Sequence, residues 1–464
     1  MTEPTTGKSV LVKHDELAEA AATDDHQQAD SCSIQDRAVS INEAKKVRGL
    51  TVLTAAVIVA GEMAGIGVLA LPRAVANATW IGLVLILVFG LAAMHTARLL
   101  GHCWIILQER YEEFRRQHVR YPYPAIAERA VGKWMRYVVS IAIDCTLFGV
   151  LIVFMLLASQ NLQSLFHQAN VNVSFCFWIL VIAAVLVPLT WFGTPKDFWP
   201  LAVGALVATA IACVMVFIQS MLQIGKSTPK YENTKDFLTF FQSFGAIAFA
   251  FGGHATFPTI QHDMRQQDRF PASCILAFGA VLTMYLPVAA AGYFVYGTDV
   301  SSNVLQSLPP GPVNIIVTIL VTAHLLCAFV IVINPLSQEL EEVLKFQHGF
   351  TWKRCVLRTV IVLIALFVAE TIPHFGAILD LVGGTSVTLL VFVSPPLFYI
   401  SLCRAKGDWP ERQISLHEYA INLEIMIVGV FSGVAATIGA INEIASPSTF
   451  VPPCYVNLTA ASGK

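Results

Sequence analysis

Residues 61–72 read Gly-Glu-Met-Ala-Gly-Ile-Gly-Val-Leu-Ala-Leu-Pro and lie inside an apolar run that begins near Leu50. Glycine costs about 1 kcal/mol in the interior of a helix, and a carboxylate costs more in the hydrocarbon of a membrane. The three glycines and Glu62 therefore predict a membrane helix that is interrupted within this stretch. Backbone freed at membrane depth must be buried in protein or line a water-filled cavity, where it can hold a ligand. We expect a ligand site at this interruption.

The composition is that of a protein that crosses a membrane many times. Hydrophobic residues make up 56% of the 464 positions and charged residues 13%, whereas a soluble domain carries about 25% charged residues. At about 20 apolar residues per crossing, the sequence predicts an all-α polytopic membrane protein with eleven transmembrane helices. They are expected at 50–72, 77–100, 136–166, 175–193, 199–224, 238–261, 271–297, 313–340, 354–371, 375–402 and 422–444.

The chain divides into three predicted parts. Residues 1–48 are polar and predict a disordered cytosolic tail, residues 49–447 form the transmembrane domain, and residues 448–464 form a short outer or lumenal tail. With a cytosolic N-terminus, most of the 29 Lys and Arg residues fall on the inner side, as the positive-inside rule requires. The sequons for glycosylation then all fall on the outer side, at Asn77, Asn172 and Asn457.

Three polar or glycine-rich features have ordinary structural interpretations. Residues 101–135 mix charges with prolines and predict a solvated, partly helical cytosolic connector. Glu339, Glu341 and Glu342 at the inner end of the eighth helix predict a solvated run of charge. Residues 383–386, Gly-Gly-Thr-Ser, predict close helix packing in the tenth helix.

A second interruption is predicted in the sixth helix, where residues 249–258 read Phe-Ala-Phe-Gly-Gly-His-Ala-Thr-Phe-Pro. Gly65 and Gly252 lie five helices apart, so the second five crossings would lie inverted relative to the first. Close packing is the ordinary interpretation of either glycine cluster alone. Two interrupted helices at matching positions, each beside an acid or a histidine, instead indicate an inverted-repeat carrier with a site near the midplane.

These stretches resemble the amino acid/auxin permease family, which includes proton-coupled, sodium-coupled and vesicular amino acid transporters. The resemblance covers about 50–445, nearly everything except the tails. It implies a LeuT-like 5+5 inverted repeat with broken helices 1 and 6 and one extra C-terminal helix, and secondary amino acid transport by alternating access. The residues that carry it are 65–72 (Gly-Ile-Gly-Val-Leu-Ala-Leu-Pro), 251–254 (Phe-Gly-Gly-His), 123–134 (Tyr-Pro-Ala-Ile-Ala-Glu-Arg-Ala-Val-Gly-Lys-Trp) and 383–386 (Gly-Gly-Thr-Ser).

At matching positions, the resemblance implies that the helix 1 break holds the substrate carboxylate on backbone amides. The helix 6 break would face the amino group or the side chain. Independently, the start of a half-helix presents free N–H groups and about half an elementary positive charge, and its end presents carbonyls of the opposite sign. A zwitterion needs both environments. The expected substrate-binding residues are Ala64, Gly65, Ile66, Gly67, Phe251, Gly252 and Gly253.

Ionisable residues inside the membrane are the first candidates for coupling transport to an ion. Glu62 adjoins the first interruption, His254 follows the glycines of the second, and Asp144 lies early in the third helix. Their structural alternatives are a brace, a hydrogen-bonding strut and an inner gate, respectively. His324 and Asp380 rank lower. Sodium is the competing driver, for which the eighth helix offers hydroxyls and amides but no definite motif; the acid and the histidine favour protons.

The sequence thus favours a proton-coupled symporter of small neutral amino acids, with a monomeric transport unit, in the plasma membrane or a lysosomal or vacuolar membrane. The alternatives are a sodium-driven or facilitative carrier, and a membrane amino acid sensor that signals to a cytosolic partner. No phosphate-binding glycine loop, nucleophile elbow or HExxH motif occurs, so neither an enzyme nor an ATP-driven pump is expected. The expected substrate is an amino acid, co-transported with H+, or with Na+ in the alternative, and the surroundings of the protein are the lipid bilayer. No cofactor, metal site or nucleic-acid partner is expected.

Overall fold

The computed structural model describes residues 49–116, 119–191, 199–232, 236–346, 351–446 and 456. These residues are mostly helical, and the two isolated backbone bridges found among them join Leu50 to Met264 and Lys230 to Gly297. The predicted tails, residues 1–48 and 448–464, lie outside the described residues apart from Val456.

The helices follow the apolar segments of the sequence. The first group consists of α2 (Val52–Met63), α3 (Gly67–Ala78), α4 (Ile81–Arg110), α5 (Glu112–Arg116), α6 (Pro122–Ala130), α7 (Lys133–Gln168), α8 (Phe175–Trp191) and α9 (Trp199–Met221). The second group consists of α10 (Phe237–Ala250), α11 (Phe257–His262), α12 (Phe270–Tyr296), α13 (Pro312–Val343), α14 (Trp352–Thr371), α15 (Phe375–Val382), α16 (Ser394–Arg404) and α17 (Leu416–Ala445). Short 3-10 turns, η1 (Gln267–Arg269) and η2 (Val304–Gln306), and π-helical turns, η3 (Gly383–Val387) and η4 (Leu389–Val393), complete the set.

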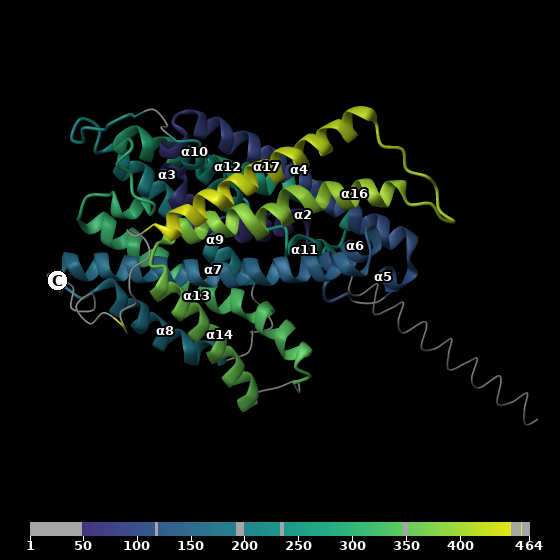
Figure 1. Cartoon of the computed structure of the whole chain (residues 1–464), viewed down its shortest axis with the longest axis horizontal. Helices are drawn as coiled ribbons and strands as arrows, with labels where there is room; N and C mark the ends of the chain where they lie inside the picture. The colour runs from purple at the N-terminus through teal and green to yellow at the C-terminus, as the bar shows by residue number, and fades with distance from the viewer. Residues whose placement is uncertain are drawn as a thin grey trace, which may run out of the picture.

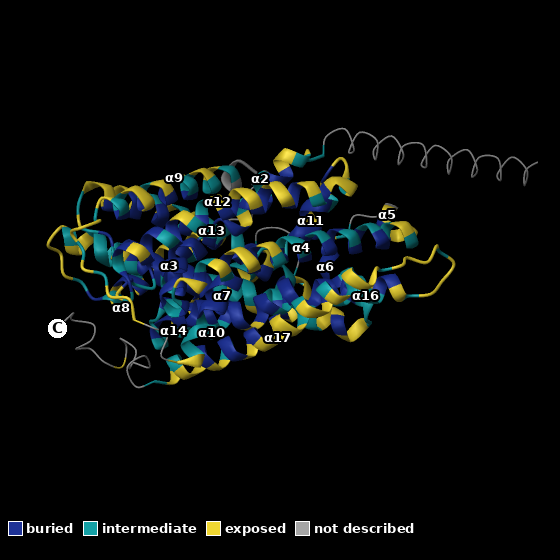
Figure 2. Ribbon diagram, turned by 90° about the horizontal axis from the view of Figure 1, so that it is seen from above, coloured by how far each residue is buried: buried dark blue, intermediate teal, exposed yellow. Residues whose placement is uncertain are grey.

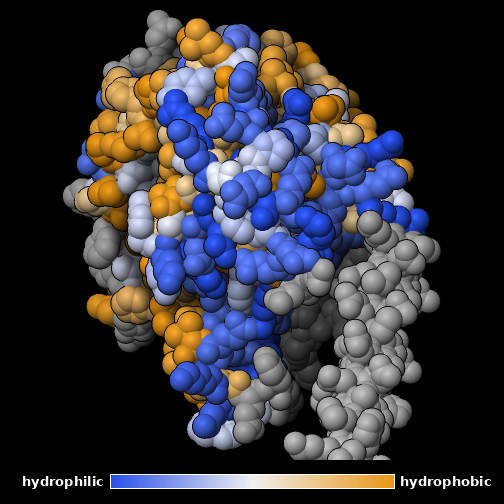
Figure 3. Space-filling view, turned by 90° about the vertical axis from the view of Figure 1, so that its right-hand side faces the viewer, coloured by the Kyte–Doolittle hydropathy of each residue, from blue (hydrophilic) through white to orange (hydrophobic). Residues whose placement is uncertain are grey.

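The long helices lie side by side along the longest axis of the molecule (Figure 1). We call the end formed by α5, α6 and residues 405–415 the near end, and the end formed by residues 79–80, 297–311 and 372–374 the far end. Figure 3 shows the near end, where hydrophilic side chains dominate the surface and hydrophobic ones lie toward its edges. A polar cap on an apolar bundle is what a membrane-spanning protein requires.

Among the described residues, seven helical segments are long and apolar enough to cross a membrane, or up to eight when the bent pair α2 and α3 counts as one. α8 and α10 are shorter apolar helices. The predicted class, an all-α polytopic membrane protein, is confirmed, whereas the count of eleven crossings stays a prediction. The seven segments are α4, α7, residues 203–221 of α9, η1 with α12, α13, α15 to α16, and α17.

Burial is arranged as expected for helices that face lipid on one side. On α4, Val84, Leu87, Val88 and Leu91 are exposed and follow helical spacing, while Ile86 and Ala93 are buried. Figure 2 shows buried residues inside the bundle and exposed ones along its sides and ends. These exposed apolar stripes are suited to contact with lipid.

The connector at 101–135 differs from its prediction. α4 continues to Arg110 instead of ending near residue 100, and α6 is packed against α7 and α16. Tyr123, Ile126 and Ala127 of α6 are buried, and the Tyr123 hydroxyl donates to the carbonyl oxygen of Leu390 at 2.6 Å. The expectation of a solvated connector was therefore wrong for α6. The many charged residues of 101–135 suggested a solvated segment, but the short apolar face of α6 is buried.

Candidate functional site

The first predicted interruption is present. α2 ends at Met63, α3 begins at Gly67, and the two helices are bent by 58°. The amide of Ala64 still donates to the carbonyl of Ala60 at 2.7 Å, and that of Gly65 donates to Met63 at 2.7 Å. Across the described residues, the next three amides, those of Ile66, Gly67 and Val68, donate to no backbone carbonyl. The start of α3 therefore presents three free N–H groups, an arrangement suited to a carboxylate.

The second predicted interruption is also present. α10 ends at Ala250, α11 begins at Phe257, and residues 251–256 join them without a helix. The amide of Phe251 donates to Ile247 at 3.2 Å, and that of Gly252 donates to Phe249 at 3.0 Å. The chain then leaves the helical path, so both carbonyl and amide groups are freed near the first break.

The two breaks lie against each other. A Cβ atom on Gly67 would lie 2.5 Å from the Cα of Ala250, so α3 can cross the end of α10 only because residue 67 has no side chain. A Cβ atom on Gly253 would lie 3.1 Å from the Cγ of Met63, which ends α2. By contrast, a Cβ atom on Gly65 would meet nothing within 4 Å.

Tyr285 of α12 joins the two breaks and was missed at the level of the sequence. Its buried hydroxyl lies 2.6 Å from the carbonyl oxygen of Met63 and 3.1 Å from that of Ala250. These carbonyls belong to the last residues of α2 and α10, which lack helical donors. No feature of the sequence predicts this role, because tyrosines are common in apolar helices and nothing near Tyr285 indicates which carbonyl groups its hydroxyl would contact.

A narrow apolar cavity lies beside the helix 1 break. Gly65 and Ile66 form one wall, Thr209 and Cys213 of α9 a second, and His324 of α13 a third. The cavity has room for about one water molecule. Of the expected substrate-binding residues, Gly65 and Ile66 thus meet in this cavity, whereas Phe251, Gly252 and Gly253 lie outside its lining.

Glu62 lies between the two breaks. Its side chain, in the last turn of α2, is surrounded by protein but keeps accessible surface, and it adjoins the hydroxyl of Thr256 in the 251–256 segment. Thr256 in turn donates to the carbonyl oxygen of Gly253 at 3.0 Å. An ionisable group thereby connects the first interruption to the second.

His254 turns away from the helix 1 cavity toward α4. Its ring is buried, and Nε2 lies 3.1 Å from the hydroxyl of Thr96 and 3.2 Å from the carbonyl oxygen of Ala93. Its ring also lies beside that of Phe257, with centroids 4.8 Å apart. This environment is what a hydrogen-bonding strut needs.

Asp144 lies on α7, close enough to Glu339 of α13 for an electrostatic interaction. Its Oδ1 atom is buried and accepts no hydrogen bond from the described part of the chain. Its neighbour Glu339 is an acid, so this contact is not an ion pair, and a role of Asp144 in coupling or as an inner gate stays a prediction.

The sequence offers four polar residues of α13 for sodium: Thr318, Thr322, Asn334 and Ser337. The first three have other hydrogen-bond partners, whereas the buried hydroxyl of Ser337 has none among the described residues. Thr318 donates to Asn314 at 2.9 Å, Thr322 donates to the carbonyl oxygen of Thr318 at 2.7 Å, and Asn334 accepts from Arg358 at 2.9 Å. None of them lines the cavity beside the helix 1 break. A sodium site there stays a prediction without an assembled ligand set.

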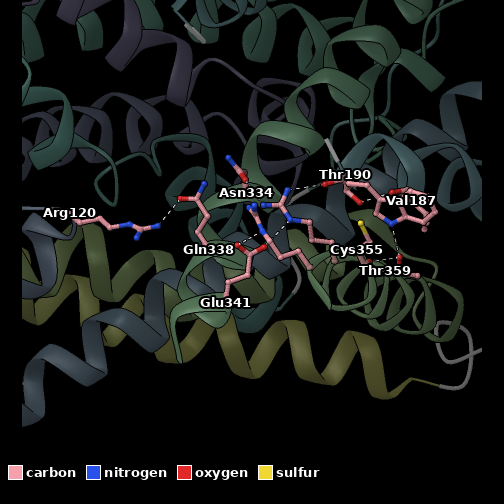
Figure 4. A network of polar contacts seen from close by, with 11 residues as sticks. Arg120, Val187, Thr190, Asn334, Gln338, Glu341, Cys355 and Thr359 are labelled. Carbon is pink, nitrogen blue, oxygen red and sulfur yellow. Dashed lines mark hydrogen bonds and ion pairs between the residues drawn. The ribbon is translucent and has the colours of Figure 1, made fainter. Parts of the chain in front are cut away.

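The acidic run at the end of α13 also differs from its prediction. Glu341 is buried and forms ion pairs with Arg358 at 3.1 Å and Arg354 at 2.8 Å. Arg358 is also buried, and it donates to Asn334 and to the carbonyl oxygen of Thr190 at 2.8 Å. Figure 4 shows Glu341 and Asn334 of α13 facing Thr190 of α8. The expectation that Glu341 is solvated was wrong, because Arg358 of α14 supplies its counter-charge.

The three glycosylation candidates have different surroundings. Asn172 is exposed in the loop between α7 and α8, at the far end. Asn77 lies within α3 and lines a cavity at the far end. Asn457 lies outside the described residues. Only the first of these described sequons is presented on a loop.

Comparison with known proteins relates the chain to amino acid transporters. A family model described as transmembrane amino acid transporter protein matches residues 48–442. The amino acid transporter AVT1C of Arabidopsis thaliana is 26% identical over 397 residues, covering 83% of this chain and 68% of that protein. The amino acid transporter AVT1J of the same plant is 23% identical, covering 82% of this chain and 88% of that protein.

Solved structures share the fold at low identity. MhsT in complex with L-phenylalanine has a TM-score of 0.56 and 13% identity, covering 84% of this chain and 99% of MhsT. A manganese transporter of Eremococcus coleocola has a TM-score of 0.53 and 13% identity, covering 88% of this chain and 90% of that chain. Together with the two broken helices, these matches confirm the predicted LeuT-like fold.

Proposed function

Because the chain belongs to the transmembrane amino acid transporter family, we propose that it carries small neutral amino acids across a membrane in symport with protons. The strongest structural support is the set of free amides on Ile66, Gly67 and Val68 at the start of α3. They offer hydrogen bonds and a partial positive charge to the carboxylate that all amino acids share. Carbonyls near the ends of α2 and α10 offer the opposite sign to the ammonium group.

The surroundings of Gly65 favour a small neutral side chain. The cavity beside the break is lined mainly by aliphatic residues, such as Val68, Leu69, Ala212 and Val216, and it is narrow. A charged side chain in such a wall would lose its hydration without gaining a partner. A small apolar side chain loses little there.

Glu62 is the proposed proton carrier. It adjoins both interruptions, it keeps accessible surface although protein surrounds it, and it contacts Thr256 of the second break. A carboxyl group in this position can bind a proton together with the substrate and release it on the other side. His254 is better suited to a structural role, since its Nε2 is already bound to α4.

The proposed orientation places the near end in the cytosol. Arg110, Arg129, Lys133 and Arg404 all lie near that end, which agrees with the positive-inside rule. At the far end, Cys176 is disulfide-bonded, and disulfides persist in oxidising compartments. The exposed sequon at Asn172 lies beside it. These features support an extracellular or lumenal far end, in the plasma membrane or a lysosomal or vacuolar membrane.

Uptake by the purified full-length protein in proteoliposomes tests this function. Labelled L-alanine and other small neutral amino acids would each be supplied with an imposed proton gradient, with no gradient, and with a sodium gradient instead. We expect accumulation that depends on the proton gradient and is indifferent to sodium. Accumulation with sodium alone would contradict proton coupling, and the absence of uptake for every neutral amino acid offered would contradict the transport function.

A further inference from the structure

A polar cavity opens at the far end, apart from the narrow cavity beside the helix 1 break. Its volume is about 400 Å3, within the range of about 300–1,000 Å3 that is usual for ligand pockets. Helices α3, α10, α15 and α17 line it, together with Ser302 of the loop after α12. Ala70, Arg73 and Asn77 lie on one face of α3, so the cavity follows the helix that begins at the break.

Asp380 of α15 supplies a negative group to this cavity. It lines the wall and is only 8% exposed. No residue of the described ranges forms a hydrogen bond or ion pair with its carboxylate. A carboxylate removed from water in this way carries a desolvation cost that an incoming cationic group would offset.

Arg73 of α3 supplies a positive group to the same cavity. Its Nη1 donates to the carbonyl oxygens of Thr298 at 3.0 Å and Val300 at 3.2 Å, in the loop after α12. These bonds anchor the guanidinium, and within the described chain it forms no ion pair with Asp380. Arg73 and Asp380 thus interact electrostatically across one cavity without an ion pair between them, and the Glu443 carboxyl lies within electrostatic reach of both.

The other carboxylates of the wall already have hydrogen bonds. Glu443 of α17 accepts from Nε2 of Gln242 at 2.8 Å. Asp236, at the exposed start of α10, accepts from the Thr239 hydroxyl at 3.4 Å. Asp380 is thus the acid of this cavity that is both buried and left without a donor among the described residues.

We propose that this cavity is an entry site for amino acid zwitterions, in which Asp380 binds the ammonium group and Arg73 binds the carboxylate. The inference depends on the proposed function, because the ligand is the transported amino acid. Only the two groups common to all amino acids are recognised, and the side chain is left in the remaining volume. The ligand then passes along α3 to the free amides at its start.

Kinetics of L-alanine uptake by the full-length protein in proteoliposomes test the site. Loss of a charge-assisted hydrogen bond predicts that Asp380→Asn raises KM about tenfold, with the maximal rate changed by less than about twofold. Asp299→Asn is the matched control, since Asp299 is exposed on the far-end loop outside the cavity lining and loses the same charge. Its KM should equal that of the unaltered protein.

Asp380→Glu keeps the charge and should restore most of the affinity, which a purely structural role would not require. Alaninamide, which has the ammonium but no carboxylate, should inhibit the unaltered protein and Arg73→Lys more strongly than Asp380→Asn. Equal KM and equal inhibition for Asp380→Asn and Asp299→Asn would overturn the entry site while uptake itself persists. Failure of the unaltered protein to take up any amino acid would instead refute the transport function.

Discussion

The hydroxyl of Tyr285 lies 2.6 Å from the carbonyl oxygen of Met63, the last residue of α2. The same hydroxyl lies 3.1 Å from the carbonyl oxygen of Ala250, the last residue of α10. One side chain from α12 thereby contacts the ends of both broken helices. It supplies a donor where the helices themselves supply none, so it fixes the spacing of the two breaks.

Replacement of Tyr285 by Phe should destabilise the protein and weaken substrate binding. The change removes the donor of the Ala250 carbonyl oxygen and one of two donors of the Met63 carbonyl oxygen, which keeps the Gly65 amide at 2.7 Å. The expected loss is about 1–3 kcal/mol. Thermal unfolding in detergent and the KM for uptake would measure the two effects. Tyr137→Phe is the control, because Tyr137 is 67% exposed and its hydroxyl can exchange partners with solvent or lipid headgroups. Equal unfolding temperatures for the two variants would argue against the bridging role.

The glycines of the helix 1 break should differ sharply in their tolerance of a side chain. Gly67→Ala places a methyl group against the backbone of Ala250, where a Cβ atom would lie 2.5 Å from a Cα atom. We expect it to abolish uptake, because backbone cannot move aside as a flexible side chain can. Gly65→Ala meets nothing within 4 Å, so the two breaks should pack normally and the variant should keep more uptake than Gly67→Ala. Similar activity in both variants would show that the two helices do not cross as closely as described.

Much of this architecture is predictable from sequence, because its causes are local. The glycine clusters beside Glu62 and His254 predict the two breaks, because whether a helix is interrupted depends on the residues at the interruption itself. The roles of Tyr285 and Arg358 could not be predicted in this way. Their partners come from other helices, such as Met63 on α2 for Tyr285, and a single sequence does not orient one helix against another.

Removal of Arg358 should be among the most damaging single changes away from the breaks. Arg358 is buried and bound to Glu341, Asn334 and Thr190, so it ties α14 to α13 and α8. Arg358→Ala removes the more deeply buried of the two arginines that pair with Glu341, while Arg354 stays 2.8 Å from the carboxylate. The loss should therefore approach but not reach the cost of a fully broken buried pair, which is about 3–5 kcal/mol. Thermal unfolding of the purified protein would measure the loss.

An exposed ion pair provides the control for Arg358. Arg136 and Glu128 are 2.7 Å apart, and the Arg136 side chain is 50% exposed. Such a pair contributes about 0–1 kcal/mol, so Arg136→Ala should unfold close to the temperature of the unaltered protein. A comparable loss in both variants would mean that the Arg358 network is solvated like a surface pair.

Replacement of Glu62 by Gln should flatten the pH dependence of uptake, if the carboxyl group carries the coupled proton. The amide keeps the shape and the contact with Thr256 but cannot bind or release a proton. Uptake driven by a substrate gradient should persist, while accumulation driven by an imposed proton gradient should be lost. His254→Gln is the comparison variant. Because the His254 ring is hydrogen-bonded to Thr96 and Ala93, this substitution should lower thermal stability and leave the pH profile of uptake unchanged. A profile that flattens with His254→Gln and survives Glu62→Gln would transfer the coupling role to the histidine.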